Sequence, residues 1–309
     1  MRQSFTVAVA LVLALSGALQ AQEPDKPANP DEKAYEIRLA RPSKVGDTVR
    51  IEATGATKKT TVLTIDGKEQ KPLEELYGIS VDGTIKVLEA TAKGIETKLS
   101  LTIDSCVAKV GEQSLPLLPR GTVIIAAWDK ENRDTRFTLD DKELPQDVAE
   151  LLDLIVTTSD PESVSDDEIF GSKEKRKAGD SWAIDAVAAA RELERLGLKV
   201  KPEHLFGETS LEKVVDVNGV PNIVVVTDFT ARSLTSDGKR GKTLKIESGN
   251  LKIKTKVTLP VDPSLPPSRA SMEMTLSREM AGANEAGKDI RASEMIERQS
   301  ERKIVPAGK

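Results

Sequence analysis

The ten residues NLKIKTKVTL (250–259) show the pattern that decides the fold class of this chain. Apolar and basic residues alternate with a period of two, which in an extended strand places them on opposite faces. The apolar face holds Leu251, Ile253, Val257 and Leu259, and the other face holds Lys252, Lys254 and Lys256. Such alternation predicts a β-strand with one buried and one solvated face.

The same period recurs along the chain, in TKLSLTID (97–104) and in SMEMTL (271–276). Turn-forming pairs separate these runs at Asp66-Gly67, Asp82-Gly83, Asn218-Gly219 and Asp237-Gly238, and each supplies the positive φ that a tight hairpin needs. Short connections between strands require antiparallel pairing. The sequence therefore predicts a mainly β protein with an antiparallel curved sheet or half-barrel.

Two segments have helical spacing instead. LPQDVAELLDLIVTT (144–158) has apolar residues three and four apart with an early proline, and we expect a helix near 145–156. DAVAAARELERLGL (185–198) predicts a second short helix, ended by Gly197. The acidic run between them, 159–168, is typical of an exposed loop. The tail 290–305 is ambiguous between helix and strand, and we favour a strand that pairs with 271–280.

A short motif occurs twice, in SKVGDTVRIE (43–52) and in KRKAGDSWAID (175–185). In both copies Lys-x-Gly-Asp-[Ser/Thr] precedes an alternating run. Glycine permits a tight turn, and the aspartate can accept backbone N–H bonds there. We interpret Gly46, Asp47, Gly179 and Asp180 as structural turns that start the first strand of each of two related halves. The expected organisation is one β-rich unit at 37–305, with halves at 37–170 and 171–305.

The N-terminus predicts export. Arg2 followed by the apolar FTVAVALVLALSGALQA (5–21) is typical of a secretory signal peptide, cleaved after Ala21 or, alternatively, after Ala18. The run is shorter than the roughly 20 residues of a membrane span, which disfavours an anchor. The Pro-rich charged residues 22–36 predict a disordered leader. We therefore expect a periplasmic or secreted protein without a membrane span in the mature chain.

The residues that usually carry catalysis are scarce. The chain has one histidine, His204, and one cysteine, Cys106, and neither has a sequence neighbour that would complete a metal site or a nucleophilic triad. We interpret His204 as a surface or loop residue, Cys106 as a packed apolar residue, and Trp128 and Trp182 as core. SDGKRGKT (236–243) resembles a phosphate-binding loop but lacks its first glycine, so a hairpin is favoured. No catalytic residue, cofactor or metal is expected.

The net charge and its distribution along the chain limit the kinds of binding partner that we expect. The formal net charge is −5, which disfavours nonspecific nucleic-acid binding. Residues 140–168 hold eleven Asp or Glu against one Lys, and residues 239–256 hold seven Lys or Arg against one Glu. The acidic run lacks a calcium-loop pattern, so we interpret it as a solvated face. The basic run is compatible with an anionic partner or with a soluble sheet face.

The stretch DEIFGSKEKRKAGDSWAID (167–185), followed by GETSLEKVVDVNG (207–219), resembles a family of exported bacterial β-rich proteins of unknown function with a Gly-Asp-x-Trp strand entry. The overall pattern is also distantly similar to lipoprotein-sorting carriers, which wrap a half-barrel around a helix and hold acyl chains. These resemblances imply a non-catalytic binding or carrier protein with an apolar or amphipathic ligand. A structural or protein-interaction scaffold in the envelope is the alternative, and an exported hydrolase is a third possibility.

Overall fold

The computed structural model describes residues 33–111, 113–236, 244–283 and 287–306. The expected signal peptide (1–21), nearly all of the expected leader and the expected hairpin at Asp237-Gly238 lie outside these residues. The end of that leader is packed rather than disordered. Tyr35 is buried and exchanges two backbone hydrogen bonds of 2.8 Å with Arg176.

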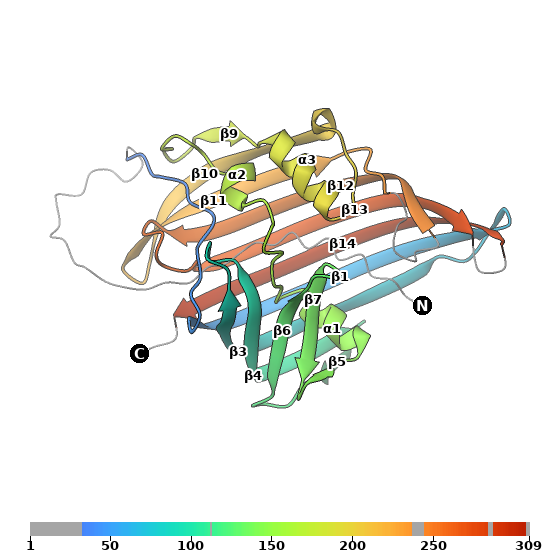
Figure 1. The fold of residues 1–309 in the computed structure, drawn as a ribbon, viewed down its shortest axis with the longest axis horizontal. Coiled ribbons are helices and arrows are strands. Elements are labelled where there is room, and N and C mark those ends of the chain that lie inside the picture. The colour runs from blue at the N-terminus through green and yellow to red at the C-terminus, as the bar shows by residue number, and fades with distance from the viewer. Residues whose placement is uncertain (1–32, 112, 237–243, 284–286, 307–309) are drawn as a thin grey trace.

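The described residues form a 14-stranded antiparallel sheet (Figure 1). The strands of the first half are β1 (Thr48–Ile65), β2 (Lys68–Glu69), β3 (Leu73–Ala90), β4 (Glu96–Val110), β5 (Gln113–Pro116), β6 (Val123–Asp129), β7 (Asp134–Leu139) and β8 (Lys142–Glu143). Those of the second half are β9 (Ser181–Ala183), β10 (Leu205–Val217), β11 (Val220–Ala231), β12 (Leu244–Pro260), β13 (Arg269–Ala283) and β14 (Asp289–Pro306).

The strand order shows two meanders joined at one place. It runs β8-β7-β6-β4-β3-β1-β14-β13-β12-β11-β10-β9, with β2 paired to β1 and β5 to β4. When the two short strands β2 and β5 are set aside, each pair of neighbouring strands is consecutive in sequence, except where β1 pairs with β14, from Val49 opposite Pro306 to Ile65 opposite Ile290. We call this junction the β1–β14 seam. The edge strands β8 and β9 do not pair with each other in the described chain, so the curved sheet stays open.

The alternation predicted from the sequence is confirmed. Leu251, Ile253, Val257 and Leu259 are buried, while Lys252, Lys254 and Lys256 are exposed. The tail is a strand, as favoured, and β14 pairs with β13 in the expected region. Its pairing with β1 on the other side was not predicted.

Three α-helices and a short 3-10 helix, η2 (Pro202–His204), accompany the sheet in the described residues, and Figure 1 shows the α-helices with it. The two predicted helices are confirmed as α1 (Gln146–Leu152) and α3 (Ala186–Arg195). The exposed loop expected at 159–168 is wrong in part, because Ser159 is buried and α2 (Asp166–Ile169) begins inside it, capped by Ser165. No described helix has the length and apolarity needed to cross a membrane.

The turn expected at Asp82-Gly83 is also wrong. Both residues lie inside β3, at a bulge where the register with β4 shifts. Gly83 is needed there for close approach, because a Cβ at this position would lie 2.5 Å from the Thr102 carbonyl oxygen. The two-residue hairpins at Asp66-Gly67 and Asn218-Gly219 are confirmed, and all four residues have positive φ.

Three buried apolar clusters fill the concave side. The first packs α1 and its C-terminal extension on β1, β3, β4 and β6. The second packs α2 and α3 on β11–β14, and the third joins Tyr35, Ile37 and Trp182 to the ends of β10–β13. The candidate site lies between α2, α3 and strands β11 and β12.

Candidate functional site

Helix α3 lies against the sheet through a face of small residues. Asp185 caps its N-terminus by accepting N–H bonds from Val187 (3.0 Å) and Ala188 (2.9 Å). Ala188, Ala189 and Leu193 are buried, whereas Val187 on the other face is 67% exposed. Alanine side chains let the helix approach the strands closely without filling all the space beneath it.

The short helix α2 is fixed by its C-terminal residues. Phe170 packs edge-on against Phe229 of β11, with ring centroids 6.2 Å apart, and its carbonyl accepts a 2.9 Å hydrogen bond from Trp182 Nε1. The expected core position of Trp182 is confirmed by its 8% exposure. These contacts hold the end of α2 against β11 at Phe229.

Residues 35–43, the crossing segment, run over the concave side and contact both halves of the chain. The Asp167 carboxylate of α2 accepts the Leu39 N–H at 2.6 Å and the Ala40 N–H at 3.4 Å. At the far end, the Ser43 N–H donates to the Gly94 carbonyl at 3.0 Å. The crossing segment therefore closes the space between α2 and the sheet from a third side.

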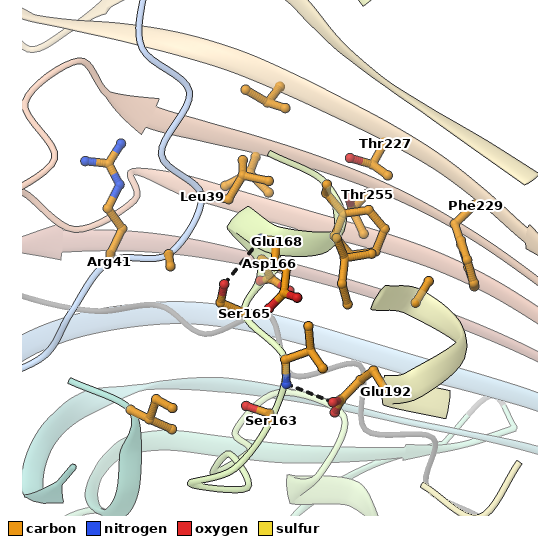
Figure 2. A pocket seen from close by; sticks show the side chains of 18 of the residues that line it. Leu39, Arg41, Ser163, Ser165, Asp166, Glu168, Glu192, Thr227, Phe229 and Thr255 are labelled. Atoms are coloured by element: carbon orange, nitrogen blue, oxygen red, sulfur yellow. Dashed lines mark hydrogen bonds between the residues drawn. The ribbon is translucent and has the colours of Figure 1, made fainter. Parts of the chain in front are cut away.

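These elements enclose a cavity of about 300 Å³ (Figure 2). The sheet contributes alternate residues of two paired strands, and the helices and the crossing segment form the opposite wall. The apolar lining is mainly Leu39, Ile169, Phe170, Leu193, Leu196, Val225, Phe229, Ile253, Val257 and Leu259. Its volume is at the lower limit of small-molecule sites, which are typically roughly 300–1,000 Å³ and mostly apolar.

The acidic and basic groups of the cavity lie on different sides of it. On the helix side, Glu192 of α3 accepts the Val164 N–H at 2.9 Å, and burial raises the pKa of its carboxyl group. Arg195 contacts Glu192 at 3.5 Å and Asp160 at 2.7 Å. These contacts fix the 160–164 segment to α3. In Figure 2, Glu192 and Arg41 lie on different sides of the pocket.

A buried carboxyl group lies directly behind the crossing segment. Glu96 accepts a hydrogen bond from the Ser43 hydroxyl, and its backbone carbonyl accepts the Ser159 N–H at 3.0 Å. Burial raises the pKa of Glu96 to about 7, despite the opposing effects of Ser43 and Arg302. The anchor of the crossing segment on the first half thus contains a group that titrates near neutral pH.

The four turn residues singled out in the sequence do not line the cavity. Gly46 has φ +95° and Gly179 has φ +89°. Asp47 accepts the Lys44 N–H at 2.7 Å, and Asp180 accepts the Lys177 N–H at 2.8 Å.

The backbone bonds that follow the two turns also correspond. The Gly46 N–H donates to the Val87 carbonyl, and the Gly179 N–H donates to the Leu211 carbonyl. The N–H of Val87 in turn donates to the Asp47 carbonyl, and the N–H of Leu211 donates to the Asp180 carbonyl. The two copies of the motif thus have the same geometry.

Histidine, cysteine and the second tryptophan lie elsewhere. His204 is half-buried at the end of η2, and Trp128 is half-buried in β6 rather than in the core. Cys106 is buried in the first cluster, and burial raises the pKa of its thiol to about 11. In the part of the chain that the structure describes, no group of three His, Cys, Asp or Glu side chains could hold a metal ion.

Sequence reasoning did not find the cavity or the role of the crossing segment. Its residues RLARP (38–42) carry no motif, and their function as a wall depends on partners more than a hundred positions away. One signal was available: Thr255 interrupts the apolar face of β12, and it is one of the polar side chains that line the cavity.

Comparison with known proteins gives no assignment. No protein-family model and no curated protein matches the chain. Among solved structures, the chain is similar to lipovitellin, in a structure titled for its lipid–protein interactions, with 11% identity and a TM-score of 0.30 over 86% of this chain. It spans only 26% of the length of lipovitellin.

Two porins are more distant still. Pseudomonas aeruginosa OccK11 shares 8% identity over 85% of this chain and 98% of its own, with a TM-score of 0.19. A mutant of the Rh. blastica porin shares 8% identity over 82% of this chain and 100% of its own, also with a TM-score of 0.19. TM-scores this low establish neither a common fold nor a common function.

Proposed function

We propose that this protein is an exported, non-catalytic carrier that holds an apolar or amphipathic small molecule. The observation that carries the proposal is the cavity of about 300 Å³ between the concave sheet and α2–α3, with its mainly apolar lining. A packed protein core usually has few voids larger than a water molecule. A space of this size, with walls from separate elements of the fold, is therefore suited to binding a small molecule.

Two carboxylates at the helix side of the cavity are engaged in holding its walls together. Glu192 accepts the Val164 N–H, and Asp167, just beneath, accepts two N–H bonds from the crossing segment. Neither His204 nor Cys106 is among the described residues that line the space. Binding without turnover is the activity that these groups support.

The test is occupation of the cavity by a neutral apolar fluorophore, N-phenyl-1-naphthylamine, added to the delipidated mature protein. We expect saturable binding with a blue-shifted emission. Thr255→Trp places a large side chain in the cavity and should reduce the affinity about tenfold or more, the effect of losing roughly 1.4 kcal/mol of binding free energy.

The matched control is Lys254→Trp, one residue away on the exposed face of the same strand. It adds the same side chain outside the cavity and should bind the fluorophore like the parent. Equal binding by both variants would place the fluorophore elsewhere, and no saturable binding by the parent would refute the carrier function.

Export is tested separately, by N-terminal sequencing of the protein recovered from its source cell. A mature chain that begins at Gln22, or at Leu19 for the alternative cleavage, is expected. An intact Met1 on the functional protein would contradict it.

A further inference from the structure

The cavity has one buried cation at its end. Arg41 of the crossing segment is 2% exposed, and its two terminal nitrogens each donate a 2.8 Å hydrogen bond to a backbone carbonyl, that of Asp262 and that of Pro260. Its Nε is buried without a hydrogen-bond partner among the described residues. Arg41 therefore has an unused donor next to an apolar space.

The charge of Arg41 also lacks a direct counter-ion. Among the described residues no carboxylate lies within 4.0 Å of its guanidinium group, which is the limit for an ion pair. The nearest acids are otherwise engaged, because Asp167 accepts the Leu39 and Ala40 N–H groups and Asp262 accepts the Ser264 N–H and hydroxyl.

Burial lowers the pKa of Arg41 to about 10, against the opposing attraction of the Asp167 and Asp262 charges, and the side chain stays charged at neutral pH. A buried charge whose direct hydrogen-bond partners are neutral carbonyl groups is costly unless an opposite charge contacts it. Carboxylate and phosphate groups are the anions whose geometry matches a guanidinium group.

The lining of the cavity is extended along one strand. It follows β12 from Ile253, opposite Phe229, to Leu259, next to the Pro260 carbonyl that Arg41 contacts. In an extended strand these two residues lie about 20 Å apart. At about 300 Å³, near the lower limit of small-molecule sites, the cavity suits a ligand with one hydrocarbon chain.

The charges of the lining set the direction of the occupant. The carboxylates of Asp166, Glu168 and Glu192 belong to the α2 and α3 side, while Arg41 lies apart from them at the other end (Figure 2). An anionic head group is repelled by the helix side and attracted by Arg41.

We infer that the carried molecule is a single-chain anionic amphiphile, with its carboxylate or phosphate monoester at Arg41 and its chain along β11 and β12 toward Phe229. This rests on the proposed carrier function and adds the chemical class of the ligand. The apolar walls account for the chain, and the unused donor of a buried cation accounts for the head group.

The experiment is displacement of N-phenyl-1-naphthylamine by four amphiphiles of equal chain length: dodecanoate, dodecyl phosphate, dodecanol and dodecylamine. At pH 8, below micellar concentrations, we expect at least one of the two anions to bind about tenfold or more tighter than the alcohol. The amine should bind most weakly. The tighter of the two anions identifies the head group.

A wild-type protein that binds dodecanol as tightly as both anions overturns the head-group assignment while leaving the carrier function intact. A protein that does not bind the fluorophore at all refutes both the carrier function and the head-group assignment. The two failures are therefore distinguishable without any variant.

Variants then locate the head group. Arg41→Met should lower the affinity for the preferred anion to that for the alcohol and change the affinity for the alcohol less than about threefold. Arg41→Lys keeps the charge and should retain part of the preference. Lys93→Met removes an exposed cation that also borders the cavity and should leave the preference unchanged. A preference that survives in Arg41→Met but disappears in Lys93→Met assigns the head group to Lys93 and refutes the inference.

Discussion

Replacing Gly179 or Gly46 with alanine tests whether the repeated motif acts through backbone shape. Both glycines have positive φ, and no atom lies within 4 Å of the place that a Cβ would occupy at either position. A methyl group therefore fits without a clash, and the cost is the left-handed backbone alone, about 1–2 kcal/mol for a residue with a side chain. In a domain of this size 1 kcal/mol corresponds to a change in melting temperature of about 2–4 °C.

The neighbouring aspartates provide a second, smaller perturbation. Asp180→Ala removes the acceptor of the Lys177 N–H, and Asp47→Ala removes that of the Lys44 N–H. Both bonds are exposed, so water replaces them in part and we expect a loss of about 1 kcal/mol or less. The order of effect within each copy should therefore be glycine first and aspartate second.

Urea unfolding and thermal melts of the four single variants give the measurement, and fluorophore binding gives the comparison. We expect lower stability with unchanged affinity. Four variants that unfold like the parent would leave the structural interpretation of the motif without support. Unchanged stability with lost binding would instead identify the motif as a ligand loop.

Three further outcomes are expected. Burial holds the pKa of Glu96 near 7 in the folded protein against about 4.5 when unfolded, so the folded state binds the proton more tightly, and the free energy of unfolding should fall by about 2–3 kcal/mol as pH rises from 5 to 8. Glu96→Gln should abolish most of this slope in urea titrations. Glu294→Gln should cost about 3–5 kcal/mol, because it leaves the buried Arg278 without the carboxylate that its Nε contacts at 2.7 Å. His204→Ala and Cys106→Ser should leave fluorophore affinity unchanged, because neither residue borders the cavity.

Controls sharpen these outcomes. The control for Glu294→Gln is Glu301→Gln, in the same strand, β14. It removes an exposed carboxylate that contacts Arg269 and should change stability by less than about 1 kcal/mol. A Glu96→Gln protein that keeps the parent's pH slope would assign the titration to another group. Loss of binding in a folded His204→Ala or Cys106→Ser variant would contradict the location of the binding site in this cavity.

The parts of the fold that depend on local pattern were predictable. Alternation identified the strand around Ile253, helical spacing identified α1 and α3, and Asn218-Gly219 marked a hairpin. Each of these depends on residues within a few positions of one another. The turn predicted at Asp82-Gly83 was wrong because the role of this glycine depends on a residue distant in sequence. It allows a close approach to Thr102 of the next strand and does not form a turn.

The candidate site was not predictable from local pattern. Arg41 lies in an ordinary polar-apolar mixture, and its burial depends on carbonyl groups at Pro260 and Asp262. The pairing of β1 with β14 likewise joins strands from the two ends of the described chain, and no turn signal specifies it. The register between strands that are far apart in sequence is set by the packing of the whole sheet. The periodicity of a single sequence carries no information about that packing.

The β1–β14 seam has a consequence for the order of folding. Chains are synthesised from the N-terminus, and β1 is complete long before β14 exists, so the first meander has an unpaired central edge while the rest of the chain emerges. Pairing of such distant segments is intrinsically slow, because the closure entropy of the long intervening chain opposes it until contacts form. The nascent protein thus passes through a stage with an open, aggregation-prone strand edge, and a chaperone that shields this edge should raise the yield of folded protein.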